Sequence, residues 1–273
     1  MYERLTGEPA ARPRTGIDLN AVDYSNKGGS LANLGRHEEA LTCYERALEI
    51  NPRDTVAWYN KACSLAGLGR HDEALTCYDR ALEINLRLPE AWYNKGVALE
   101  RLGHPGEALT CYDRALEINP RLADAWLNKG HVLADLGRSN EALTCCERAL
   151  EINPRLAEAW FNKGGTLDDL ARPAEALTCY ERGLEINPRD AEAWFNKGVV
   201  LGKLGRPRAE ALACYERALE INPRFAEAWF NRGFDLLRTG RLEEALACFE
   251  QAQQAGHPQA AEAIAVCRRK LGM

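Results

Sequence analysis

The chain has 273 residues, a formal net charge of −5 and a pI near 5.7, so it lacks the basic excess that is typical of general nucleic-acid binders. No stretch approaches 18 consecutive apolar residues, and residues 1–20 contain no apolar run of a signal peptide, which argues against a membrane partner. Ten cysteines without an export signal fit a reducing compartment, so we expect a soluble cytoplasmic protein.

Residues 1–20 show little apolar periodicity and predict a poorly ordered lead. After them the sequence repeats itself, because the six tryptophans follow one another at intervals of 34, 34, 34, 34 and 35 residues, and Tyr24 fills the same place one period earlier. A fixed period near 34 is typical of a solenoid, whose units bury their apolar faces against their neighbours. The predicted repeats are 21–54, 55–88, 89–122, 123–156, 157–190, 191–225 and 226–259, with one extra residue near Pro207 in repeat six.

Each repeat divides into two predicted helices, A and B, in which we number positions from the first residue of the repeat. Positions 4, 8 and 11 form one apolar stripe on helix A, and the glycine at position 15 predicts a left-handed end. Repeat five has Ala171 at that position. Helix B carries Ala at 20, Leu at 21, an aromatic residue at 24, and small and apolar residues at 27 and 28, and Asn-Pro then stops it. Residues 260–273 predict one last helix that caps the stack.

This pattern of Trp at 4, Gly at 8, Ala at 20, Tyr at 24, Ala at 27 and Pro at 32 resembles the tetratricopeptide (TPR) repeat over residues 21–259. The resemblance implies an all-α fold, a right-handed α-solenoid superhelix of helix-turn-helix TPR repeats whose helices A line a concave groove. It also implies a module for peptide binding and assembly without chemistry of its own. One departure is a basic residue at position 7, where the family usually has Leu. Its stem either covers apolar surface, which we expect, or its charge binds an anion.

Helical geometry predicts which residues face away from the core. At about 100° per residue, positions 2, 6, 9 and 13 lie opposite the tryptophan. Position 6 is Asn in every repeat, and a carboxamide can pair with both the N–H and the C=O of an extended ligand. The row either binds a peptide backbone or is duplicated structure without such a use. The candidate peptide-binding members are Asn60, Asn94, Asn128, Asn162, Asn196 and Asn231.

The aromatic residues at position 5, among them Tyr93 and Phe161, either anchor ligand side chains or pack between helices. His131 projects into the same predicted groove. Five acids gather in repeats four and five, and they either favour a ligand with Lys or Arg near its middle or form a solvated face. These acids are Asp124, Asp135, Glu158, Asp168 and Asp169.

Seven cysteines recur at position 23, beside the buried stripe of helix B, where Cys acts as a small apolar residue. Equivalent atoms on successive repeats should be too far apart for a disulfide, and no zinc-ligand spacing occurs. The adjacent Cys145 and Cys146 have no predicted use. Without a nucleophile–base pair or a phosphate loop, we expect no enzyme, no cofactor and no metal.

The sequence therefore predicts a protein–protein interaction module that holds an extended, basic-centred peptide of a partner in its groove. Two alternatives remain: a structural spacer or self-assembly scaffold that uses the convex helix B faces, and a regulatory domain of a separate enzyme.

Overall fold

The computed structural model describes residues 19–273, so the predicted lead lies almost entirely outside the described residues. This part of the chain is all-helical, as predicted, and its helices follow one another in pairs. Successive helices A are α1 (Ala21–Asn33), α3 (Thr55–Gly67), α5 (Pro89–Arg101), α7 (Ala123–Asp135), α9 (Ala157–Asp169), α11 (Ala191–Lys203) and α13 (Ala226–Arg238). Successive helices B are α2 (His37–Ile50), α4 (His71–Ile84), α6 (Pro105–Ile118), α8 (Ser139–Ile152), α10 (Pro173–Ile186), α12 (Arg208–Ile221) and α14 (Leu242–Gln254).

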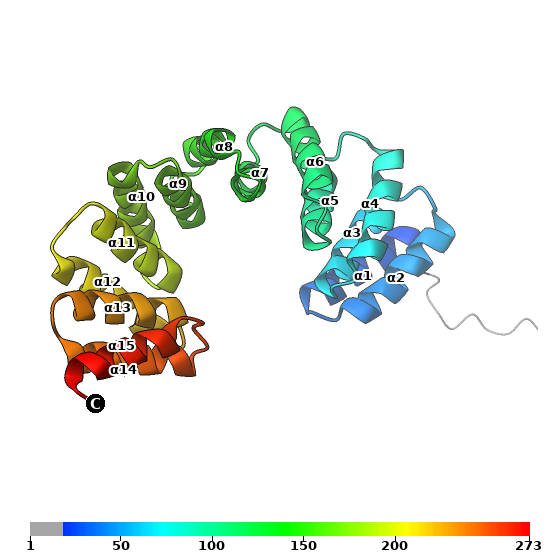
Figure 1. Ribbon diagram of the computed structural model, residues 1–273. Coiled ribbons are helices and arrows are strands. Elements are labelled where there is room, and N and C mark those ends of the chain that lie inside the picture. Colours follow the sequence, from blue (N-terminus) through cyan, green and yellow to red (C-terminus); the bar gives the residue numbers. More distant parts are fainter. Residues whose placement is uncertain (1–18) are drawn as a thin grey trace, which may run out of the picture. The chain divides into compact units, whose positions relative to one another are not determined.

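The chain divides into two compact units, whose helices are labelled in Figure 1. The first unit ends at His104 and contains α1 to α5, and the second runs from Pro105 to the end of the chain. Within each unit a helix A packs against helix B of its own repeat, and that helix B packs against the next helix A. Each unit is thus a stack of neighbours, which is how repeats bury their apolar faces without a central core.

Helix A ends in the left-handed turn that glycine at position 15 predicts. In repeat one, the N–H of Gly35 donates to the carbonyl of Ala32 at 2.9 Å, and the N–H of Arg36 donates to that of Leu31 at 2.9 Å. These two bonds form a Schellman motif. Ala171 adopts the same conformation with a φ of 55°, and within residues 19–273 it is the one non-glycine residue with a positive φ. The glycines at this position have φ between 65° and 79°: Gly35, Gly69, Gly103, Gly137, Gly205 and Gly240.

The core of each repeat combines small residues with one aromatic ring from helix B, except in repeat four, where Cys146 takes the place of the ring. In repeat one, Ala40 and Ala47 are completely buried, and Tyr44 between them is 1% exposed. The Tyr44 ring lies so near helix A that a Cβ built on Gly28 would be 2.5 Å from its Cε1 atom. Glycine at position 8 therefore lets the aromatic ring approach the backbone of helix A.

The tryptophan at position 4 joins each repeat to the one before it. The indole N–H of Trp58 donates to the backbone carbonyl of Pro52, in the turn that ends repeat one, at 3.0 Å. This bond fixes the turn to the next helix A. The tryptophans, which the sequence places in the apolar stripe of helix A, thus hold neighbouring repeats together. The same bond joins Trp92 to Leu86, Trp126 to Pro120, Trp160 to Pro154, Trp194 to Pro188 and Trp229 to Pro223.

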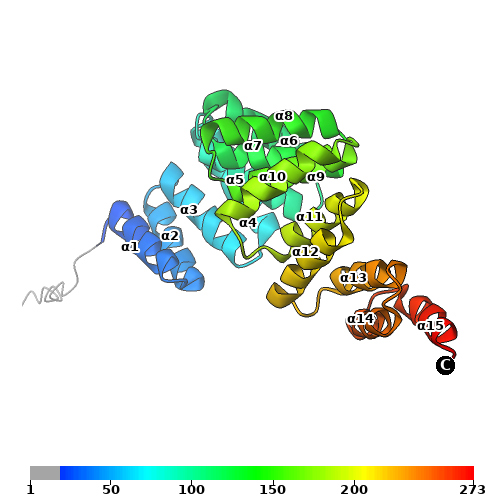
Figure 2. The ribbon, with the colours of Figure 1, turned by 90° about the vertical axis from the view of Figure 1, so that its left-hand side faces the viewer.

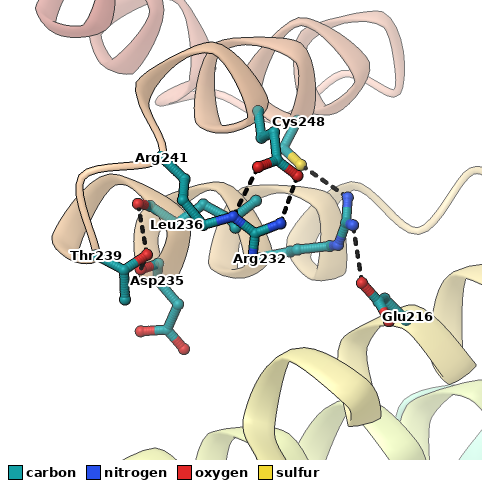
Figure 3. A network of polar contacts seen from close by, with 8 residues as sticks. Glu216, Arg232, Asp235, Leu236, Thr239, Arg241 and Cys248 are labelled. Atoms are coloured by element: carbon teal, nitrogen blue, oxygen red, sulfur yellow. Dashed lines mark hydrogen bonds and ion pairs between the residues drawn. The ribbon is translucent and has the colours of Figure 1, made fainter. Parts of the chain in front are cut away.

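The basic residue at position 7 forms a second link between repeats. Lys129 Nζ lies 5.4 Å from the ring centre of Trp126 and 2.5 Å from Oδ1 of Asp113 on the preceding helix B. In repeat seven, Arg232 reaches Glu216 of α12 in the same way, at 2.9 Å (Figure 3). The structural role predicted for position 7 is therefore confirmed. The other pairs are Lys61–Glu45, Lys95–Asp79, Lys163–Glu147 and Lys197–Glu181.

A single helix, α15 (Ala260–Leu271), follows the last repeat and packs on α14 (Figure 2). Its buried Ile264 and Cys267 join the apolar cluster around Phe249. Arg268 also forms an ion pair with Glu250 of α14 at 3.0 Å. This helix covers the apolar surface that α14 would otherwise expose at the end of the stack.

Candidate functional site

The side chains at positions 2, 6, 9 and 13 of helix A, which we call the A-helix face, border several pockets of this fold. In repeat five they are Glu158, Asn162, Gly165 and Asp169, and all four border one pocket. Helices α9 and α11 form most of its wall, and His131 of α7 adds to it. The geometric prediction of the face opposite the tryptophan thus identifies the residues that surround an open volume.

This pocket, which we call the acidic pocket, has a volume of about 510 Å³. Four carboxylates border it, Glu158, Asp169, Asp190 and Glu192, and its lining contains no Lys or Arg. Like charges that share a partly enclosed volume create a negative potential that attracts cations. The pocket is therefore suited to a ligand group with a positive charge.

Polar groups at the base of the acidic pocket add hydrogen-bonding capacity. Burial raises the pKa of the Tyr180 hydroxyl, and the charges of Asp168 and Asp169 raise it further, so this group stays a neutral O–H. The Nδ2 group of Asn162 is buried and has no hydrogen-bond partner among the described residues. Buried donors are normally paired, so Asn162 holds an unused donor beside the acidic pocket.

Gly165 gives the acidic pocket part of its depth. A Cβ at this residue would meet Tyr180 Oη at 3.6 Å and no other heavy atom closer than 4 Å. The space above Gly165 is therefore open rather than filled by a neighbouring side chain. Larger residues occupy position 9 in the other repeats of the second unit, namely His131, Val199 and Phe234.

The predicted asparagine row is not uniform in the structure. Asn162 and Asn196 border the acidic pocket, whereas Asn60 borders a separate pocket of about 420 Å³ in the first unit. Asn231 borders a pocket between α11 and α13. Asn94 donates from Nδ2 to the Tyr59 hydroxyl at 2.9 Å, so in repeat three the carboxamide links neighbouring repeats. Asn128 and Tyr93 are half-buried.

Only part of the predicted acidic group lies in the acidic pocket. Glu158 and Asp169 border it, but Asp124 and Asp135 are exposed outside it. Asp135 lies on the same helix as His131, with Oδ2 3.8 Å from its Nδ1. Asp168 is directed toward the next repeat, where its Oδ2 lies 2.7 Å from Lys203 Nζ.

Two further acids, Asp190 and Glu192, were missed as site residues. Glu192 is at position 2, so the helical arithmetic that selected Glu158 could have selected it as well. Asp190 lies in the turn before α11, where its carboxylate caps the helix by accepting from the Ala193 N–H at 2.8 Å. A prediction built on helix faces does not reach such a turn residue.

The aromatic residues at position 5 pack within the stack and also reach the face. Tyr59 lies against Tyr78 with ring centres 6.2 Å apart, and Phe230 against Phe249 at 5.4 Å. Phe161 is half-buried and borders the acidic pocket. The packing role at position 5 is thus present in the fold, and the anchoring of ligand side chains stays a prediction.

The cysteine row lies in the apolar interior. None of the ten cysteines forms a disulfide, and every one except the half-buried Cys63 is buried. Burial raises the pKa of Cys145 to about 11 and that of Cys146 to about 12, so both thiols stay protonated at neutral pH. Among residues 19–273 no group of three or more His, Cys, Asp and Glu is placed to hold a metal ion. None of the described helices is long and apolar enough to cross a membrane.

Comparison with solved structures gives the same repeat architecture. A TPR protein, YrrB, described as having an unusual peptide-binding site, is 29% identical, with 68% of this chain and 95% of that chain covered and a TM-score of 0.59. The type IV pilus biogenesis factor PilW is 24% identical, with 76% and 96% covered and a TM-score of 0.66. A tetratricopeptide repeat protein from Parabacteroides merdae is 20% identical, with 90% and 98% covered and a TM-score of 0.66. The last two likenesses concern the fold alone.

Protein-family models match nearly all of the repeats. The model described as tetratricopeptide repeat matches residues 89–122, 123–156 and 191–225, and related TPR models match 19–84, 145–178, 174–205 and 226–255. A search of curated proteins gave no significant match. With matches that extend from residue 19 to residue 255, interrupted only at 85–88, the chain belongs to the tetratricopeptide repeat family.

Proposed function

We propose that this protein binds an extended segment of a partner protein on the A-helix face of its second unit, with a Lys or Arg side chain in the acidic pocket. TPR proteins serve in protein–protein interaction, which sets the class of function. The observation that carries the finer proposal is the lining of the acidic pocket, with four carboxylates and no cation. A ligand cation in this pocket would increase the association rate and the specificity of binding.

Backbone groups of the segment would pair with the asparagines of the same pocket. The buried Nδ2 of Asn162 lacks a partner among the described residues, and Asn196 borders the pocket from α11. A rotation of the Asn162 side chain would turn this donor toward a ligand carbonyl, and such a bond contributes about 0.5–1.5 kcal/mol. The likeness to YrrB, a TPR protein described as having an unusual peptide-binding site, supports a peptide as the ligand.

The outer faces of helices B support the use of the A-helix face rather than the scaffold alternative. Their charges are paired within the chain: Arg148 lies 2.8 Å from Glu151 on α8, and the acid at position 25 binds the basic residue at position 7 of the next repeat. Paired and exposed charges of this kind are typical of solvation. The acidic pocket, by contrast, leaves its carboxylates without a cation in the lining.

The test is the affinity of a lysine-centred peptide for the protein, measured by fluorescence anisotropy at low salt. The variant Asp169→Asn with Glu192→Gln removes two charges from the acidic pocket and should weaken binding about three- to tenfold. The matched control is Glu185→Gln with Glu220→Gln, which removes two charges from helices B of repeats five and six. Equal loss of affinity in both variants would show that net charge acts without the pocket, and unchanged affinity in the pocket variant would contradict the proposal.

A further inference from the structure

A second pocket, which we call the basic pocket, lies one repeat further along the second unit and has the opposite charge. Its volume is about 430 Å³, and α11, α12 and α13 contribute its walls. Asp235 is its one acid, and Asn231 of the asparagine row also borders it. Four cations line it: Lys203, Arg206, Arg208 and Arg238.

Two of these cations, Arg206 and Arg208, lie in or beside the lengthened turn of repeat six. In repeat one, Arg36 and Glu39 form a bidentate pair with both contacts at 2.6 Å. In repeat six the extra residue lengthens the turn, and Arg206 instead approaches one oxygen of Glu210 at 3.3 Å. The basic group of Arg206 is therefore less tightly held than its counterparts in other repeats.

Arg208 begins α12, where the other repeats have no Lys or Arg. Its guanidinium forms an ion pair with Asp235 of α13, an acid that is only 9% exposed. Position 10, which Asp235 occupies, carries no other charged residue in the seven repeats. This pair neutralises the one acid in the basic pocket, so the remaining cations determine its potential.

Arg238 is the cation best placed for a ligand. Its guanidinium carbon lies 5.9 Å from the ring centre of Phe234, which is 48% exposed. Arg238 forms no ion pair within residues 19–273. Lys203, at the same position one repeat earlier, is paired with Asp168 at 2.7 Å. An arginine that is held against a ring and keeps its donors available can bind a carboxylate with both arms.

We propose that the basic pocket receives an acidic side chain of the same extended segment whose basic side chain occupies the acidic pocket. This inference rests on the proposed function and adds a second determinant of specificity. Helix α11 borders both pockets, with Glu192 and Asn196 on one and Val199 and Lys203 on the other. Neighbouring packed helices lie about 10 Å apart and an extended chain advances about 3.3 Å per residue, so the two ligand charges should be separated by roughly three to five residues.

The experiment uses synthetic peptides with both ends blocked, each with one Lys in a Gly-Ser background. A Glu is placed three, four or five residues from the Lys on either side, and a sister peptide carries Gln at the same place. At low salt, the Glu peptide of the correct spacing should bind the full-length protein about three- to fivefold more tightly than its Gln sister. The Arg238→Gln variant should bind the two sisters equally, while the control Arg217→Gln on the outer face of α12 should keep the difference.

The outcomes separate the two proposals. If lysine peptides bind but Glu gives no gain at any spacing, the basic pocket does not take a carboxylate, and the proposed function stands without it. The same conclusion follows if the gain persists in Arg238→Gln. If no lysine peptide binds, the proposed function fails and this inference fails with it.

Discussion

At the scale of single residues, glycine has two distinct physical roles in this chain. At position 15 the backbone needs a positive φ, which Ala171 adopts at a steric cost that glycine avoids. At position 9 of repeat five the backbone is an ordinary helix, and Gly165 matters because it leaves volume in the acidic pocket. Substitutions at position 15 should therefore change the stability of the protein, whereas substitutions of Gly165 should change ligand binding.

Ala171→Gly should stabilise the protein, because it removes left-handed strain that is partly offset by the greater freedom of glycine in the unfolded chain. The expected gain in free energy of unfolding is about 0.5–1 kcal/mol. The reverse change in the next repeat toward the N-terminus, Gly137→Ala, should destabilise by a similar amount. Urea unfolding of both variants measures this, and a destabilised Ala171→Gly would show that φ at this turn is not strained.

Gly165→Val should separate stability from binding. Val occupies this position in repeat six as Val199, and a helical glycine costs up to about 1 kcal/mol relative to Ala, so the variant should be at least as stable as wild type. Its side chain should fill part of the acidic pocket and lower the affinity for a lysine peptide. The control Gly29→Val, at the same position of repeat one, should leave that affinity unchanged. Full affinity in Gly165→Val would exclude the pocket as the ligand site.

At the scale of helices, the link between repeats combines an indole hydrogen bond, a cation–π contact and an ion pair. The link at Trp126 shows all the parts. Its indole N–H donates to Pro120, the Lys129 ammonium lies 5.4 Å from its ring centre, and Lys129, whose side chain is 21% exposed, pairs with Asp113 of the preceding helix. Each part is modest, since exposed ion pairs contribute about 0–1 kcal/mol and cation–π contacts about 0.5–1 kcal/mol. Repetition along the stack makes their sum important, because solenoid stability adds over interfaces.

A double-mutant cycle on Lys129 and Asp113 should measure this link. Lys129→Met keeps the stem but removes the charge, and we expect it to cost about 0.5 kcal/mol, whereas Lys129→Ala should cost about 1 kcal/mol or more. The coupling between Lys129→Met and Asp113→Ala should be a few tenths of a kcal/mol and should decrease in high salt. A coupling of zero at low salt would mean that the pair adds nothing to the interface.

The sequence predicts helices better than it predicts pockets, for a physical reason. Periodicity and turn glycines determine where α1 to α14 begin and end, since both act within a few residues. The acidic pocket depends on contacts between repeats, which helix periodicity does not describe. Asp168 therefore forms an ion pair with Lys203 instead of bordering the pocket, and Asp190 borders it from the turn before α11. Gly183 is a second example. It resembles a helix defect in the sequence, but its missing Cβ would lie 2.2 Å from Phe161 Cε1, so the glycine makes room for a residue of the acidic pocket.

At the scale of the whole molecule, the buried thiols make stability sensitive to alkaline pH. Burial raises the pKa of Cys145 and Cys214 to about 11 and that of Cys146 to about 12, from an ordinary value of 9.0. Well below pH 9 the thiols are protonated in both states, so they add no pH dependence. Above it the unfolded chain ionises first, and the folded state loses stability as pH rises from about 9 toward about 11.

Urea unfolding at pH 7, 9 and 10.5 should therefore show a flat region followed by a fall in the free energy of unfolding. Cys146→Ala should be less stable at pH 7, because it leaves a small cavity, but its stability should fall less steeply above pH 9. An unchanged slope in this variant would mean that Cys146 does not contribute to the alkaline loss.

The central claim, that the acidic pocket selects a basic side chain, is tested most directly by comparing one peptide in two versions, centred on Lys or on Glu, with wild-type protein. At low salt the Lys version should bind more tightly. Near 1 M salt, where the Debye length is about 3 Å, the difference should shrink while the binding that depends on Asn162 and Asn196 persists. Equal affinities of the two versions at low salt, or a preference for Glu, would contradict the account.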